Sequence, residues 1–91
     1  MAAADFTFSL HLSEDVRFDE MLSDLTHTVL RHVGYPEASI AAIADDLKSG
    51  VSAGRRRGIG CDVEFRAQDG ELEIFVSQGG QRVYRTRHRL P

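Results

Sequence analysis

The chain has 91 residues, of which 42% are hydrophobic and 27% are charged, and its formal net charge is −3. These proportions are those of ordinary globular proteins, so they exclude a disordered or fibrous chain, and the length predicts a single domain over residues 1–91. The single cysteine, Cys61, excludes an internal disulfide, and the lack of any long apolar run predicts a cytoplasmic protein without a membrane segment.

The first third of the chain is expected to hold a strand followed by a helix. Apolar and polar residues alternate over residues 6–12, the pattern of a strand with one buried face. Ser13 can cap a helix that begins near residue 15, and apolar residues then recur at spacings of three and four as far as Val33. Gly34 is suited to end this helix in the left-handed conformation.

A second helix is expected around Pro36, which suits a first helical turn because it has no N–H group. Its apolar stripe runs from Ile40 to Val51, and the helix is expected to end between residues 50 and 55. Residues 55–58, Arg-Arg-Arg-Gly, then predict an exposed connection.

The remaining segment predicts strands joined by short turns. Alternation places four apolar residues on one face of the first of these strands, namely Ile59, Cys61, Val63 and Phe65. Asp69-Gly70 is a strong hairpin signal because both residues tolerate a positive φ, and a second turn is expected at residues 77–80.

A fourth strand is expected over residues 81–89, at an edge of the sheet, with Val83 and Arg85 on one face and Tyr84 on the other. The predicted fold class is therefore α+β. Two helices pack on one face of a three- to four-stranded, mainly antiparallel sheet, in the order β-α-α-β-β-β.

Two segments carry the pattern of a known nucleotide site. Asp45 occupies the position of an acidic residue in the second helix, and Ser49 follows where asparagine would hold magnesium. Residues 72–80 end a strand, with Gln78 where an aspartate would read adenine and Gly80 where a glycine follows. With the order of elements over residues 6–80, these segments resemble GHKL-type, histidine-kinase-like ATPase domains, particularly the anti-sigma-factor serine kinase branch.

The resemblance implies a truncated, degenerate relative that has lost the kinase chemistry. Magnesium prefers oxygen ligands in octahedral geometry, and the chain contains no asparagine. Gln78 would bind an adenine amine more weakly than a carboxylate does. We therefore expect no cofactor, no metal and no catalysis, with Asp45, Ser49, Gln78 and Gly80 as remnants of a cofactor site. A reduced ATP-binding regulatory domain using Asp45, Gln78 and Gly80 is the alternative.

The other reactive residue types predict structural roles. The four histidines are His11, His27, His32 and His88. Two of them, His27 and His32, are five residues apart, which does not align them on one helical face as metal ligands. Cys61 lies in the apolar phase of a strand and is expected to be a core residue rather than a nucleophile. The glycines around residues 55–57 are not followed by the lysine-serine pair that ends a phosphate-binding loop.

Basic residues concentrate in the second half of the chain. Residues 1–50 hold nine acidic and three basic side chains, whereas residues 51–91 hold five acidic side chains and eight arginines. The candidate partner-binding residues are Arg55, Arg56, Arg57, Arg82, Tyr84, Arg85 and Arg87. The leading hypothesis is a non-enzymatic protein-interaction module, as a homodimer or with another protein, that pairs through its arginine-rich edge strand. Nucleic acid is the alternative partner, and the acidic overall charge disfavours it.

Overall fold

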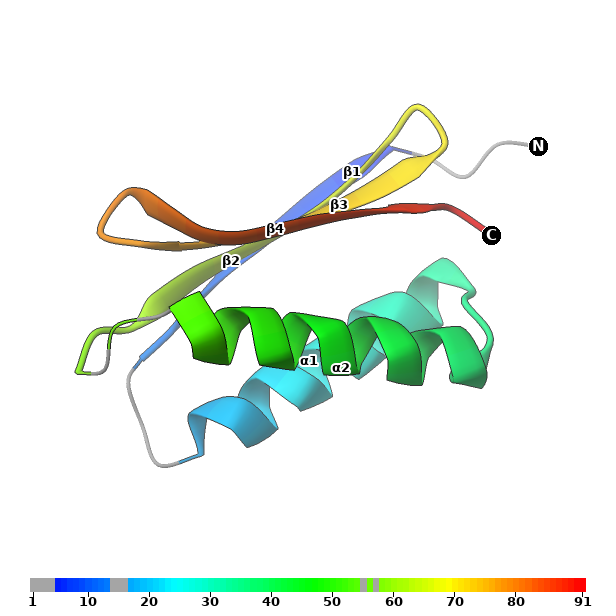
Figure 1. The fold of residues 1–91 in the computed structure, drawn as a ribbon. Coiled ribbons are helices and arrows are strands. Elements are labelled where there is room, and N and C mark those ends of the chain that lie inside the picture. Colours follow the sequence, from blue (N-terminus) through cyan, green and yellow to red (C-terminus); the bar gives the residue numbers. More distant parts are fainter. Residues whose placement is uncertain (1–4, 14–16, 55, 57) are drawn as a thin grey trace.

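Four antiparallel strands form one sheet, and two helices lie side by side on one of its faces (Figure 1). The computed structural model describes residues 5–13, 17–54, 56 and 58–91. The elements in chain order are β1 (Phe6–Leu12), α1 (Phe18–Val33), α2 (Glu37–Gly54), β2 (Cys61–Gln68), β3 (Glu71–Gln78) and β4 (Gln81–Arg89). The predicted α+β class and its element order are confirmed.

The strands follow one another in space as they do in sequence, in the order β1-β2-β3-β4. Two-residue turns join the last three strands. Asp69 and Gly70 have φ values of 54° and 78°, and Gly79 and Gly80 have values of 55° and 80°. Positive φ at both central residues matches the twist of paired strands, so each turn closes its hairpin without splaying the strands. This order leaves β1 and β4 as the two edges.

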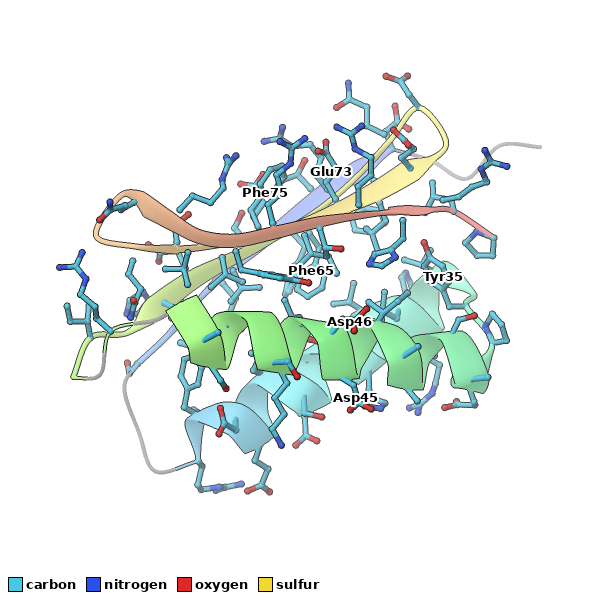
Figure 2. All side chains as sticks on the ribbon, in the orientation of Figure 1. Tyr35, Asp45, Asp46, Phe65, Glu73 and Phe75 are labelled. Carbon is cyan, nitrogen blue, oxygen red and sulfur yellow. The ribbon has the colours of Figure 1, made fainter. Side chains whose placement is uncertain are left out.

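The core lies between the sheet and the helices. Alternate residues of β2 and β3 face the helices and are buried, and the buried stripes of α1 and α2 meet them. Figure 2 shows Phe65 between the sheet and the helices, whereas Glu73 and Phe75 lie on the opposite, open face. Among the described residues, no helix is both long and apolar enough to cross a membrane.

The ends of the helices agree with the sequence except at the start of α1. Gly34 ends α1 with a φ of 107°, as predicted, and its N–H group donates to the carbonyls of Leu30 and Arg31. The carbonyl of Pro36 accepts a 3.0 Å bond from the N–H group of Ile40, so Pro36 stands directly before α2. The predicted cap at Ser13 is wrong, because α1 begins at Phe18. Arg17 holds the N-cap position instead, directly before the buried Phe18.

Strand β4 contains an irregularity that the alternation did not reveal. Arg82 pairs with Ser77, whereas Tyr84 pairs with Val76, so Val83 is an extra residue in the ladder. A bulge of this kind shifts the phase of the strand. Val83 therefore faces α2 next to Tyr84, and the prediction that it shares the face of Arg85 is wrong. Ile59 also lies outside its predicted strand, and 43% of it is exposed.

Helix α2 approaches strand β4 closely through two glycines. A Cβ atom added at Gly50 would overlap the ring of Tyr84, and one added at Gly54 would lie 3.0 Å from both Cγ1 and the carbonyl oxygen of Val83. The hydroxyl of Tyr35, before α2, also donates a 2.7 Å bond to the carbonyl of Arg89 at the end of β4. Helix and strand are therefore held together along their length.

The substitution Gly50→Ala is expected to destabilise the fold. Alanine in a helix interior normally stabilises by about 1 kcal/mol over glycine. Here the added methyl group overlaps Tyr84, and we expect a net loss of roughly 1–3 kcal/mol in the free energy of unfolding, as for an overpacked core. Urea unfolding followed by circular dichroism measures it. The control is Ser49→Ala on the exposed side of the same helix, and a second substitution, Tyr84→Ala, should remove part of the penalty. A Gly50→Ala variant as stable as the wild type would contradict this packing.

Candidate functional site

Gln78 takes the place of the adenine-reading aspartate in the predicted cofactor site. Both its amide oxygen and its amide nitrogen form hydrogen bonds to backbone groups of the protein. Its Oε1 accepts a 2.6 Å bond from the backbone N–H group of Arg56, and its Nε2 donates to the carbonyls of Arg56 at 2.9 Å and Ile59 at 3.1 Å. Only 2% of its surface is exposed. The amide therefore binds both polar groups of the Arg56 backbone and anchors the connection between α2 and β2.

The other three residues of the predicted cofactor site lie apart from the amide of Gln78. Asp45 and Ser49 are exposed on α2, one turn apart, and Figure 2 shows Asp45 directed away from the sheet. Gly80 forms the turn between β3 and β4, with nothing within 4 Å of its added Cβ position. Between α2 and β4 the space is filled by Val83 and Tyr84, packed on the two glycines. The four residues do not converge on a common pocket.

Removing the amide of Gln78 is expected to destabilise the protein. In Gln78→Ala, one N–H group and two carbonyls of the α2–β2 connection lose their partner, and a buried unpaired polar group costs about 1–3 kcal/mol. Gln78→Glu should be at least as damaging, because a carboxylate cannot donate to the two carbonyls. The control is Gln81→Ala, an exposed glutamine whose side chain accepts from the Arg56 guanidinium. Equal urea midpoints for Gln78→Ala and Gln81→Ala would refute the anchoring role.

The histidines and the cysteine lie in separate places. His11 on β1 bonds to Asp62 at 2.8 Å on the open face, and His27 bonds to the carbonyl of Ser23 on α1 at 2.9 Å. Cys61 is fully buried in the core. In the part of the chain that the structure describes, no three histidine, cysteine or acidic side chains are grouped as a metal site would need.

His88 faces the helices from β4, and its Nε2 lies 3.0 Å from the hydroxyl of Thr86. Burial lowers the pKa of His88 below its ordinary value, and the nearby carboxylate of Asp46 opposes that effect only in part. The neutral imidazole is therefore the form that the fold accommodates.

This lowered pKa predicts a loss of stability on mild acidification. As the pH falls, His88 becomes protonated near the ordinary histidine pKa of 6.5 in the unfolded chain, but only at a lower pH in the folded chain. The free energy of unfolding should therefore fall as the pH drops from 6.5 towards the lower folded-state pKa. Urea titrations at several pH values should show this slope in the wild type and its flattening in His88→Gln. The Asp46→Asn variant should have a steeper slope, and an unchanged slope in His88→Gln would contradict the assignment.

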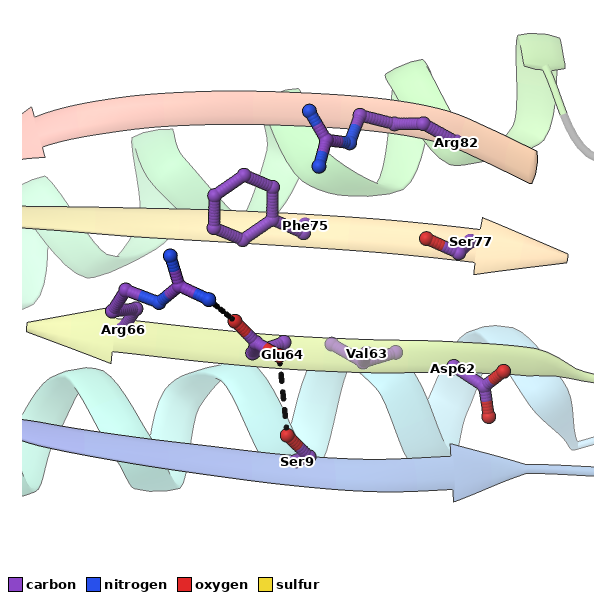
Figure 3. Close-up of a pocket in the computed structure, with 8 residues that line it drawn as sticks. All are labelled: Ser9, Asp62, Val63, Glu64, Arg66, Phe75, Ser77 and Arg82. Carbon is purple, nitrogen blue, oxygen red and sulfur yellow. Dashed lines mark hydrogen bonds and ion pairs between the residues drawn. The ribbon is translucent and has the colours of Figure 1, made fainter. Parts of the chain in front are cut away.

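The open face of the sheet carries a hollow of about 220 Å³ beside Phe75 (Figure 3). Three arginines stand around the Phe75 ring, with guanidinium carbons 4.6 Å (Arg82), 5.3 Å (Arg66) and 5.8 Å (Arg85) from its centroid. Cations at these distances are attracted to the ring face. Figure 3 shows Arg66 bonded to Glu64, which Ser9 also contacts.

Carboxylates on the same face form ion pairs with two of these three arginines, Arg66 and Arg85. Glu73 accepts from Arg85 at 3.1 Å and from Arg87 at 3.3 Å, and Arg66 lies 2.6 Å from Glu64. Burial would raise the pKa of Glu73, but its hydrogen bonds to Arg87 and Arg85 outweigh that effect and hold the pKa below its usual range. Of the arginines predicted to bind a partner, Arg85 and Arg87 are thus paired with carboxylates within the sheet, whereas Arg82 lies over the Phe75 ring.

The remaining partner-binding candidates are distributed differently. Tyr84 is half-buried against Gly50, on the helix side of the sheet. Arg56 is exposed and its guanidinium donates to Gln81 at 3.1 Å. Arg55 and Arg57 lie outside the described residues.

An apolar groove of about 610 Å³ runs between the edge strand β1 and helix α1. Its walls are Phe6, Phe8, Leu25, Thr28, Val29, His32, Val33, Ala67 and Leu90. Phe8 faces the groove, and Leu10 continues the same side of β1; they are 40% and 39% exposed, although their side chains share the face of the core. Helix α1 therefore covers β1 only in part.

The sequence did not predict this groove. Alternation over residues 6–12 correctly indicated one apolar face, but it does not tell whether a helix covers that face. The available signal was the density of large apolar residues in a strand without charges.

No protein-family model matches this chain, and no curated protein matches it significantly. The resemblance to GHKL-type ATPase domains therefore stays a prediction from the residues.

Proposed function

We propose that this chain is a non-catalytic protein-interaction module, related to the histidine-kinase-like ATPase domains, and that it binds a protein partner in the groove between β1 and α1. The observation that carries the proposal is that groove, in which large apolar side chains stand open to water beside an edge strand. Extended apolar surfaces of this kind mark protein-binding sites, since leaving them exposed is unfavourable.

The chemistry of the groove supports a protein partner over a nucleotide. His32 is its one titratable wall residue among those described, and the other walls offer a phosphate no cation. An edge strand beside an apolar groove can bind a chain segment through both backbone hydrogen bonds and side-chain pockets. The surface therefore suits a polypeptide.

The alternative of a reduced ATP-binding domain has little support. Its adenine-reading candidate, Gln78, already bonds to two backbone residues, and Asp45 points away from the sheet. The nucleic-acid alternative rests on the arginines around Phe75. Four carboxylates on the same face oppose it, from Asp62, Glu64, Glu71 and Glu73.

The proposal predicts groove-dependent binding and no nucleotide binding. Immobilised wild-type protein and the Ile59→Lys variant should retain the same partner protein from a cell lysate, whereas Phe8→Lys, which changes a wall of the groove, should lose it at least tenfold. Ile59 is the matched control because it is an apolar residue of similar exposure outside the groove walls. Calorimetry with Mg-ATP at millimolar concentration should give no binding heat. Heat that saturates in that range, or equal retention by Phe8→Lys, would overturn the proposal.

A further inference from the structure

The two edges of the sheet are protected to different degrees. Strand β4 carries four arginines and a bulge, which are devices that keep an edge from pairing with another strand. Strand β1, with the sequence FTFSLHL, has no lysine, arginine, acid or proline, and its seven residues pair with β2 without a bulge. Strand β4 is therefore protected against pairing with a strand of another molecule, whereas β1 carries none of these protective features.

We propose that a second copy of this chain occupies the groove, by pairing β1 with β1 of the other copy in antiparallel orientation about a twofold axis at Ser9. This assignment rests on the proposed function and names its partner. It moves the pairing edge from the arginine-rich strand β4, which the sequence favoured, to β1. The two sheets then join into one continuous sheet.

The sequence of β1 is complementary to itself in this register. On the helix side, Phe8 lies opposite Leu10 of the other copy, and Phe6 lies opposite Leu12. On the open face, Thr7 lies opposite His11, and Ser9 meets its own symmetry mate. Each apolar side chain therefore meets an apolar one, and no charged carboxylate or guanidinium belongs to the joined strands.

Neighbouring registers are less favourable. Centring the axis at Ser9 pairs all seven residues of β1, whereas moving it to Phe8 or Leu10 leaves two of them without a partner in the other β1. Sliding one strand past the other by a single residue, which would centre the pairing between Ser9 and a neighbour, would set apolar side chains opposite polar ones, because successive residues point to opposite faces. The Ser9 register is thus the one that the pattern selects.

The same arrangement closes the groove. Joining the strands brings the two grooves together, so Phe8 and Leu10 of each copy lie near Leu25 and Val29 on both α1 helices. Stable interfaces bury roughly 1,200–2,000 Å² in total, which is more than a strand ladder alone provides. The facing sides of the α1 helices supply the remaining contact.

The oligomeric state tests the proposal directly. In light scattering with size-exclusion chromatography at micromolar concentration, the wild type and Ile59→Lys should be dimers and Leu10→Lys a monomer. An added lysine on an edge strand is the natural means of blocking such pairing. Circular dichroism checks that each variant is folded. A monomeric wild type, or a dimer that survives Leu10→Lys, overturns the dimer, while groove-dependent retention of another protein would leave the proposed function standing.

A cysteine pair tests the register without depending on the Leu10→Lys variant. In Ser9→Cys the two sulfurs come together at the axis, where paired residues have Cβ atoms about 4.5–5.5 Å apart. In Thr7→Cys they are about 13 Å apart, beyond the reach of a disulfide. Mild oxidation should therefore cross-link Ser9→Cys and not Thr7→Cys, with the wild type as the blank for the buried Cys61. Equal cross-linking of both variants, or of neither, overturns the register.

Discussion

The close packing of α2 on β4 is the constraint from which the other surfaces of this protein follow. It depends on Gly50 and Gly54, whose missing side chains leave room for Tyr84 and Val83. Two further connections support it. Tyr35 bonds to the end of β4, and Gln78 holds the backbone that leaves α2. Because α2 packs against β4, α1 is left to cover the part of the same sheet face that lies towards β1.

Helix α1 does not cover the helix-facing side of β1 completely. Residues of β2 and β3 on the helix side are buried, but the same side of β1 keeps Phe8 and Leu10 about 40% and 39% exposed. The asymmetry is thus a geometric consequence of two helices lying on a four-stranded sheet, with the tighter contact at β4. The uncovered apolar surface is gathered at one edge, where backbone groups are also available for pairing.

The open face of the sheet is organised by charge rather than by burial. Arg85 and Arg87 of β4 form ion pairs with Glu71 and Glu73 of the neighbouring strand β3, and three arginines surround Phe75. Exposed ion pairs of this kind contribute little stability singly, because water screens them and long side chains lose freedom in forming them. The arginines in these pairs also keep β4 charged and therefore unsuited to pairing with another strand.

The sequence by itself determined the elements and their order, because these depend on local properties. Periodicity located the strands and helices, Asp69-Gly70 and Gly79-Gly80 specified the hairpins, and Gly34 ended α1. Tertiary structure alone decided how the elements meet. The bulge at Val83, the use of the Gln78 amide by a connection 22 residues earlier, and the exposure of Phe8 and Leu10 depend on contacts between distant segments. A periodic pattern states which face of an element is apolar, but the placement of the neighbouring layer decides how much of that face is covered.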